Sequence, residues 1–215
     1  MKTPEAASLQ DHVYLTLRQW LTVGKYLPGD RLKIKTIADE MNVSQMPVRA
    51  ALQRLAAEHA VVNIPNCGMT VPTLSKAQFD DVLQVRLMLE GQAAESGAHR
   101  LTEDERQQLI TLCQEMREAL AAMNAKAYLD ANEDFHLILY TAGGSPLLME
   151  LIETVWLQVG PISNRLFEDS NFAKRLNDAH EDAMVALENR DPTGVRRAIE
   201  RDIFYAAQHL KSLCT

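Results

Sequence analysis

Apolar side chains near the start of the chain recur every three or four residues, which is the spacing of an amphipathic helix. Val13, Leu17 and Leu21 belong to the first such face, and Gly24 is a natural helix end. Two shorter helical patterns follow, and Asn42 between them tolerates the left-handed backbone of a tight turn. The predicted elements of this part are helices over about 9–23, 34–41 and 45–58.

The pattern changes after His59, where β-prone residues replace the helical spacing. Val61–Ile64 and Met69–Val71 are two short runs, and the loop at 65–68 between them is rich in turn formers. Three helices followed by a hairpin is the order of a winged helix-turn-helix. The segment Pro72–Leu74 is then the natural linker to whatever follows.

From Ser75 onward the chain carries helical patterning, interrupted by clusters of Gly, Pro, Ser, Asn and Asp. The expected breaks are at 143–146, 169–171 and 191–194. The expected helices cover about 75–98, 103–124, 126–141, 146–167, 172–189 and 192–212. The sequence therefore predicts a mainly α protein, with a winged helix-turn-helix in residues 1–73 and an all-helical bundle in residues 76–215.

Composition excludes several classes of protein. Apolar residues make up 47% of the chain and charged residues 24%, which is typical of a globular protein. No apolar run approaches the roughly 18 residues of a membrane span, and Met1–Gln10 lacks the apolar core of a signal peptide. Cys67, Cys113 and Cys214 are odd in number and widely spaced. This spacing argues against a disulfide framework or a zinc ribbon and indicates the reducing cytoplasm.

The net charge of −7 is unusual for a nucleic-acid binder, but it is unevenly distributed. Residues 1–75 contain eight Lys and Arg against six Asp and Glu, which gives +2. Residues 76–215 contain fourteen against twenty-three, which gives −9. The first part is therefore free to approach phosphates, whereas the acidic second part is not.

Residues 37–49 have the features of a helix-turn-helix. The small side chain of Ala38 allows a second helix to cross closely, Val43 and Val48 fill the corner, and Ser44 is a good N-cap. The first turn of the second helix then faces outward, where Gln45 suits an adenine edge and Arg49 a guanine edge or a phosphate. The alternative is a helical hairpin with merely solvated polar residues. The candidate DNA-contacting residues are Ser44, Gln45, Met46 and Arg49, with Arg31, Lys33 and Lys35 as phosphate contacts.

Residues 9–73 resemble the GntR family of bacterial regulators. The resemblance rests on Pro28-Gly29-Asp30-Arg31-Leu32, on Val43-Ser44-x-x-Pro47-Val48-Arg49-x-Ala51-Leu52-x-x-Leu55, and on Gly68-x-x-Val71. It implies a DNA-binding winged helix-turn-helix and adds Gly68 of the wing to the DNA-contacting residues.

This chain departs from the family pattern at three positions. Asn42 and His59 stand where the family has Gly, and both residue types tolerate positive φ, so we expect the fold to be kept. Gln45 replaces an Arg that commonly contacts bases, so the operator is expected to differ.

Four residues of the second part are candidate metal ligands. Asn132 and His136 are four residues apart and so share a helix face, while His180 and Asp202 lie on later helices. Oxygen and imidazole donors inside a helical bundle suit zinc, nickel or manganese. The alternative is that the histidines are ordinary core or surface residues.

Residues 76–212 resemble the FCD ligand-binding domain of the FadR-type branch of the same family. The resemblance rests on Val85-Arg86-x-x-Leu89-Glu90, Asn132-x-x-Phe135-His136, Gly144-Ser145-Pro146-Leu147 and His180-x-x-x-x-x-Ala186. It implies a divalent metal held by Asn132, His136, His180 and Asp202, and a small carboxylate effector. Asn replaces the usual Asp and Asp the usual third His, which shifts the site toward harder oxygen ligands.

Arg86 has two interpretations. A buried guanidinium matches a carboxylate in a bidentate way, which would make Arg86 the effector-binding residue. Alternatively, Arg86 forms an ion pair with Glu90, one helical turn further along.

The leading hypothesis is a homodimeric DNA-binding transcription regulator that responds to a small carboxylate, bound with or without a metal. A metal-dependent enzyme and a helical interaction module that does not bind specific DNA are the alternatives. The chain has no H-E-x-x-H motif and no nucleophile elbow, so no enzymatic activity is expected. The sequence leaves open the effector, the operator, and repression versus activation.

Overall fold

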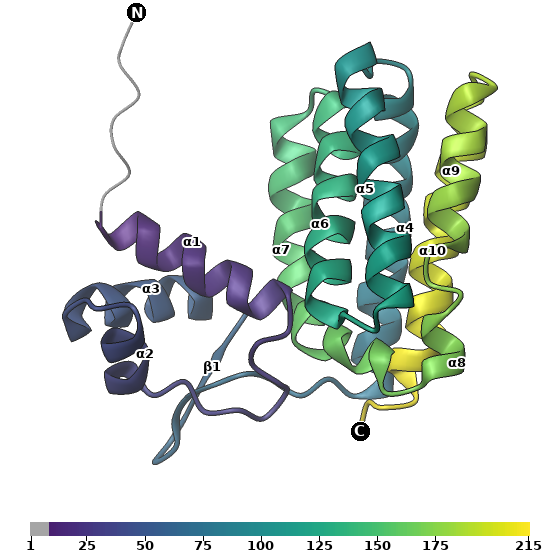
Figure 1. The fold of residues 1–215 in the computed structure, drawn as a ribbon. Helices are drawn as coiled ribbons and strands as arrows, with labels where there is room; N and C mark the ends of the chain where they lie inside the picture. The colour runs from purple at the N-terminus through teal and green to yellow at the C-terminus, as the bar shows by residue number, and fades with distance from the viewer. Residues whose placement is uncertain (1–8) are drawn as a thin grey trace, which may run out of the picture.

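The computed structural model describes residues 9–215 and shows two packed parts joined by a short connection (Figure 1). The first eight residues, where no signal peptide was expected, lie outside the described residues. The first part contains α1 (Leu9–Thr22), α2 (Ile34–Glu40), α3 (Gln45–Ala57), β1 (Val62–Ile64) and β2 (Gly68–Thr70). The second contains α4 (Lys76–Ala98), α5 (Glu103–Ala121), α6 (Ala125–Ala142), α7 (Pro146–Ser163), the 3-10 turn η1 (Asn164–Phe167), α8 (Ser170–Ala173), α9 (Asp178–Glu188) and α10 (Pro192–Lys211).

The first part, which we call the head, forms because three helices bury one apolar stripe each. Leu17 of α1, Ile37 of α2 and Leu52 of α3 are buried together in one apolar core. Asn42 and His59 adopt the left-handed backbone, with φ of 53° and 59°, as the sequence predicted for the turns after α2 and α3. Ser44 occupies the N-cap position of α3, but its side chain makes no capping hydrogen bond among the described residues.

The wing is the antiparallel pair β1–β2, in which Asn63 lies opposite Met69. Gly68 opens β2 with a φ of 82°, a conformation that residues with a Cβ rarely adopt. A further bridge joins Arg31 to Thr70, so the segment before α2 is fixed against the wing. The predicted winged helix-turn-helix is confirmed.

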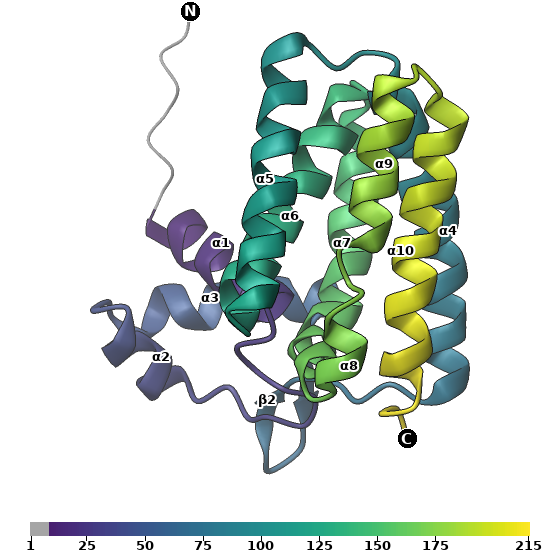
Figure 2. The same cartoon turned by 45° about the vertical axis from the view of Figure 1, so that its right-hand side comes forward.

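The second part is a bundle of long helices standing side by side, with α4 and α10 forming one adjacent pair and α5 and α6 another (Figure 2). Its core is continuous and includes Phe135, Leu139 and Ile199 at 0% exposure. Ser75 and Thr102 each form a capping box at the start of α4 and α5, which fixes where these helices begin. The predicted mainly α architecture is therefore confirmed.

The expectation of one helix over 172–189 is wrong. The chain forms the short helix α8, turns at 174–177, and starts α9 at Asp178. Asn177, 4% exposed, donates a side-chain hydrogen bond to the carbonyl oxygen of Cys113 on α5. This tertiary bond fixes Asn177 as the N-cap residue of α9, immediately after the turn that separates the two helices. The predicted helix over 146–167 also tightens into η1 after Ser163.

The head is packed against the bundle through α1 and α7 (Figure 1). Leu157 of α7 is 1% exposed and belongs to the apolar core of the head. Arg18 of α1 forms an ion pair with Glu153 at 2.7 Å, and Gln158 donates to the carbonyl oxygen of His59 at 3.3 Å. The two parts therefore share a core contact and polar contacts as well as a peptide connection.

Among the described residues, no helix has the combined length and apolarity that crossing a bilayer requires.

Candidate metal centre and DNA-contacting surface

The first turn of α3 presents the predicted base-contacting residues to solvent. Ser44, Gln45, Met46 and Arg49 are all exposed, and Met46 is 70% exposed although it is apolar. Val48, on the opposite face of the helix, is fully buried. The helix is thus held by its apolar face and leaves its polar face free, which is the arrangement of a recognition helix.

The predicted phosphate-contacting residues lie around the same face. Arg31, Lys33 and Lys35 are exposed at the start of α2. Within residues 9–215 the structure records no ion pair for Arg31, Lys33, Lys35 or Arg49. Gly68 of the wing lies near Arg31, because a Cβ there would stand 3.8 Å from the guanidinium. These exposed positions agree with phosphate contacts made beside the recognition helix.

Three of the four predicted metal ligands come together in the bundle core. His136 of α6, His180 of α9 and Asp202 of α10 offer donor atoms that all lie within 4.8 Å of one another. The Nε2 atoms of the two imidazoles are 3.3 Å apart, and His136 Nε2 is 3.4 Å from Asp202 Oδ2. We call these residues the His–His–Asp cluster.

These distances fit a metal ion. Two donors that each lie about 2.1 Å from a tetrahedral ion are roughly 3.4 Å apart, which agrees with the spacing in the cluster. Imidazole nitrogens and one carboxylate are donors that zinc, nickel and manganese accept. The cluster could therefore hold a divalent metal with coordination positions left for further ligands.

A chain of hydrogen bonds orients His136. Its Nδ1 lies 2.9 Å from the hydroxyl of Tyr140, which in turn lies 3.1 Å from Glu90 Oε2. A neutral imidazole can bind a metal through Nε2 when its proton is on Nδ1, and Tyr140 can accept that proton in a hydrogen bond. Burial raises the pKa of Tyr140, and Glu90 adds to that rise, so the hydroxyl remains protonated.

The protonation states also suit metal binding. Burial lowers the pKa of His180 to about 4, although Asp202 opposes the shift. His180 is therefore neutral at pH 7, which is the form that binds metals. Burial opposes ionisation of Asp202, but the two imidazoles and Arg86 outweigh it and hold the pKa of this carboxyl below its usual value.

Arg86 forms the ion pair with Glu90 that the sequence allowed, with Nε 2.7 Å from Oε1. Burial lowers the pKa of Arg86, but the attraction of Glu90 more than compensates, so the pKa stays above its ordinary value. Arg86 also lines a cavity together with Asn132 and His136. The ion pair and a role in ligand binding are therefore compatible.

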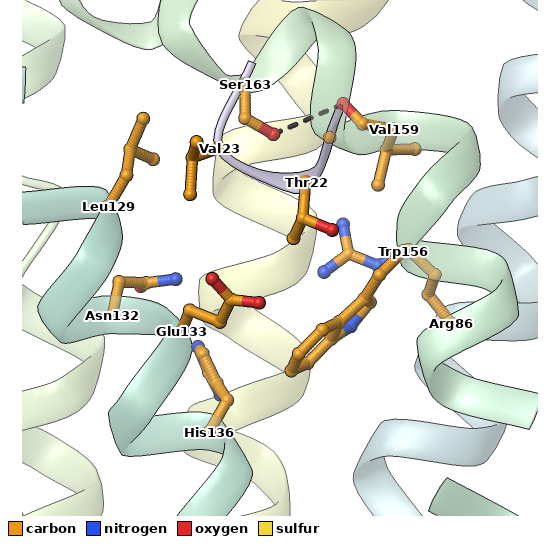
Figure 3. Close-up of a pocket in the computed structure, with 11 residues that line it drawn as sticks. Thr22, Val23, Arg86, Leu129, Asn132, Glu133, His136, Trp156, Val159 and Ser163 are labelled. Carbon is orange, nitrogen blue, oxygen red and sulfur yellow. Dashed lines mark hydrogen bonds between the residues drawn. The ribbon is translucent and has the colours of Figure 1, made fainter. Parts of the chain in front are cut away.

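The cavity has a volume of about 70 Å³ and lies between α4, α6 and α7 (Figure 3). Asn132 and His136 share its wall, which is the common helix face that their spacing predicted. Trp156 is 7% exposed, and its indole Nε1–H has no hydrogen-bond partner among the described residues. The cavity lining consists of Thr22, Val23, Arg86, Leu129, Asn132, Glu133, His136, Trp156, Val159, Gly160 and Ser163.

Several lining residues carried no signal in the sequence. Trp156 and Thr22 reach the cavity because α7 and α1 cross there, and no local pattern shows such a crossing. Tyr140 could have been found, because it lies one turn beyond His136 on the same face. Glu133 is a second omission: burial, aided by Asp134 and Asp130, raises its pKa to about 7.

A winged helix-turn-helix with an exposed recognition helix, joined to a helical bundle that carries a cavity lined by charged and polar groups, defines a DNA-binding transcription regulator with a sensing domain. Comparison with known families agrees. Residues 9–71 match the family described as bacterial regulatory proteins, gntR family, and residues 81–204 match the FCD domain. The chain belongs to the GntR family, in the FadR-type branch that carries an FCD domain.

Individual relatives are also transcription regulators. The chain is 31% identical to the HTH-type transcriptional regulator McbR of Escherichia coli K12, over 87% of this chain and 89% of McbR. It is 26% identical to the transcriptional repressor RspR of the same organism, over 95% and 87% of the two chains. The solved structure of E. coli McbR/YncC superposes with a TM-score of 0.91 at 27% identity, covering 97% of this chain and 99% of that one. The expectation that the chain is not an enzyme is confirmed, because these relatives regulate transcription.

Proposed function

We propose that this regulator binds its operator with an affinity set by a small carboxylate, which occupies the cavity beside a divalent metal held by the His–His–Asp cluster. The observation that carries the proposal is the cavity itself. It places the imidazole of His136, the guanidinium of Arg86 and the unpartnered indole N–H of Trp156 around one small volume (Figure 3). These groups together complement an anion with more than one hydrogen-bond acceptor.

Zinc, nickel or manganese would be held by His136, His180 and Asp202, with the neutral amide of Asn132 as a fourth and weaker donor. Bound there, the metal supplies a Lewis acid to which a carboxylate oxygen can attach. Arg86 is the effector-binding residue in this proposal. It can exchange part of its contact with Glu90 for the incoming carboxylate, because its guanidinium carries five donors.

The DNA side of the proposal assigns base contacts to Ser44, Gln45, Met46 and Arg49, and phosphate contacts to Arg31, Lys33, Lys35 and the wing at Gly68. Exposure of these four residues at the start of α3 supports it. A homodimer would place two heads on a palindromic operator. We assign dimerisation to the bundle, whose exposed apolar side chains include Met88, Leu147 and Phe204.

The metal is tested by elemental analysis and thermal melting of the full chain, purified without chelator. Wild type should carry about one metal per chain, and adding zinc to metal-stripped protein should raise its Tm by mass action. The variant His136→Ala, His180→Ala should lose both effects. A matched control, His12→Ala, His99→Ala, removes two exposed histidines outside the cavity and should keep both.

A wild type that carries no metal, and whose melt is unmoved by zinc, nickel and manganese, would overturn the metal site. The regulatory part is tested on operator fragments recovered from genomic DNA by the purified protein. Stripping the metal should change the affinity for these fragments, and equal affinity with and without metal would contradict coupling between the cavity and the head.

A further inference from the structure

The cavity beside the His–His–Asp cluster is not built from the bundle alone. Thr22, the last residue of α1, and Val23, the next residue, line it together with α4, α6 and α7. Figure 3 shows both residues above the hollow that Glu133, Trp156 and Arg86 surround. One wall of the sensing cavity therefore belongs to the DNA-binding head.

A second hollow beside this cavity is also lined by α1. This hollow of about 290 Å³ is lined by Leu15, Arg18 and Gln19 of α1, and it shares Thr22, Glu133 and Trp156 with the cavity. The two hollows lie directly against each other because they share these lining residues. Arg18 and Glu153, which form the ion pair between α1 and α7, both line this outer hollow.

The position of α1 over the cavity depends on one glycine. A Cβ at Gly160 of α7 would lie 2.5 Å from Thr22 Cα and 2.7 Å from the carbonyl oxygens of Leu21 and Thr22. These are backbone atoms, which cannot move aside as a flexible side chain can. The glycine thus allows α1 to lie against α7 closely enough to cover the cavity.

We propose that the DNA-binding head is the lid of the sensing cavity, with Thr22 and Val23 as residues that contact the bound effector. This inference rests on the proposed role of the cavity as the effector and metal site. A ligand in the cavity then touches the head itself, and its size sets how closely α1 lies against α7. Coupling between the ligand and the head needs no relay through the bundle. It must also be reciprocal, so that moving the head changes how tightly the cavity holds its contents.

The test uses zinc as the probe and the full-length protein. Zinc-loaded wild type is mixed with excess EDTA, and the release of zinc is followed over time. Gly160→Ala should push α1 away from α7 and weaken zinc binding by about 5- to 150-fold, the range of affinity changes typical of coupled sites, and a weaker hold on zinc accelerates its release to EDTA. The matched control is Gly91→Ala, another buried helical glycine, whose added Cβ would meet the flexible side chain of Glu200 at 2.6 Å.

A second variant removes wall atoms without adding any, in case Gly160→Ala does not fold. Thr22→Ala, Val23→Ala shortens the two partly buried side chains and should also accelerate zinc release. Thr16→Ala, on the same helix and outside both hollows, should not.

The outcomes separate the lid from the metal site. If wild type binds zinc, and both Gly160→Ala and the Thr22, Val23 variant release it at the wild-type rate, the lid proposal is wrong. The metal-site proposal is then unaffected. Equal acceleration in Gly91→Ala would indicate general loosening and would also overturn the lid. A wild type that binds no zinc would overturn the metal site, and the lid with it.

Discussion

Four neighbouring side chains at the start of α3 differ in what they can recognise. Gln45 offers an amide that pairs with adenine in the major groove, whereas Arg49 offers a guanidinium that pairs with guanine or with phosphate. Both are exposed, and the buried Val48 holds the helix in place between them. Single substitutions at these positions should therefore change DNA recognition without changing the fold.

Arg49→Ala should weaken binding to the native operator by at least about 1–3 kcal/mol, because it removes a bidentate base contact. Gel-shift titration measures the effect. Arg197→Ala on α10 removes an exposed arginine far along the chain and serves as the control. An affinity unchanged by Arg49→Ala would show that the recognition surface lies elsewhere.

Gln45→Arg should shift the preferred half-site from adenine toward guanine, because the guanidinium pairs with guanine O6 and N7. Selection of bound sites from a random DNA pool, carried out with wild type and the variant in parallel, measures the preference. If both proteins select the same consensus, residue 45 does not face the bases.

The sequence and its family resemblance predicted the three side chains that gather in the His–His–Asp cluster, but not what surrounds them. The spacing of Asn132 and His136 predicted their shared face, and the family resemblance pointed to His180 and Asp202. Trp156 and Thr22 could not be predicted in the same way. They enter the cavity through the crossing of helices that are far apart in the sequence, and tertiary packing decides such a crossing.

At the scale of elements, α4 and α6 pack very closely at Gly97. Among the glycines of the bundle, this is the position where an added Cβ would lie nearest to a neighbouring atom. A Cβ at Gly97 of α4 would lie 1.8 Å from the carbonyl oxygen of Leu139 on α6. Because this neighbour is backbone, the two helices would have to separate to admit a methyl group.

Gly97→Ala should therefore destabilise the protein by about 1–3 kcal/mol through overpacking, despite the better helix propensity of alanine. For a chain of this size that is a fall in Tm of roughly 2–4 °C per kcal/mol, measured by calorimetry. Gly91→Ala on the same helix, next to a flexible side chain, is the control. A melting temperature that rises in Gly97→Ala would mean that α4 and α6 pack less closely than described.

Helix boundaries were predictable wherever a capping residue marks the start of a helix or a glycine marks its end. The capping boxes at Ser75 and Thr102 are local signals, and α4 and α5 begin at the next residue in each case. The turn before α9 was missed because it goes with a tertiary bond from Asn177 to α5, 64 residues away in the sequence. The apolar periodicity over 172–189 is a local feature and carries no information about a hydrogen-bond partner at that distance.

On the scale of the whole molecule, charge is divided between the two parts. The segment 1–75 is positive by two and the segment 76–215 negative by nine. DNA phosphates therefore attract the positive head and repel the negative bundle. This division orients the molecule before any specific contact forms.

The full chain should be a homodimer at micromolar concentration, because two heads must be held together to bind a palindrome. Light scattering should give about twice the 24.1 kDa of one chain. Repeating the measurement at high salt distinguishes apolar association from charge attraction. A monomer mass under both conditions would reject the assignment.

Leu157 has a consequence for how such regulators can be recombined. This side chain belongs to α7 by sequence but to the apolar core of the head by packing. In a chimaera that joins this head to the bundle of a relative, the relative's residue would replace Leu157 in the apolar core of this head. Exchanging DNA specificity between members of the family therefore requires the surface of α7 to be transplanted along with the head, so heads and sensors are expected to have diversified together.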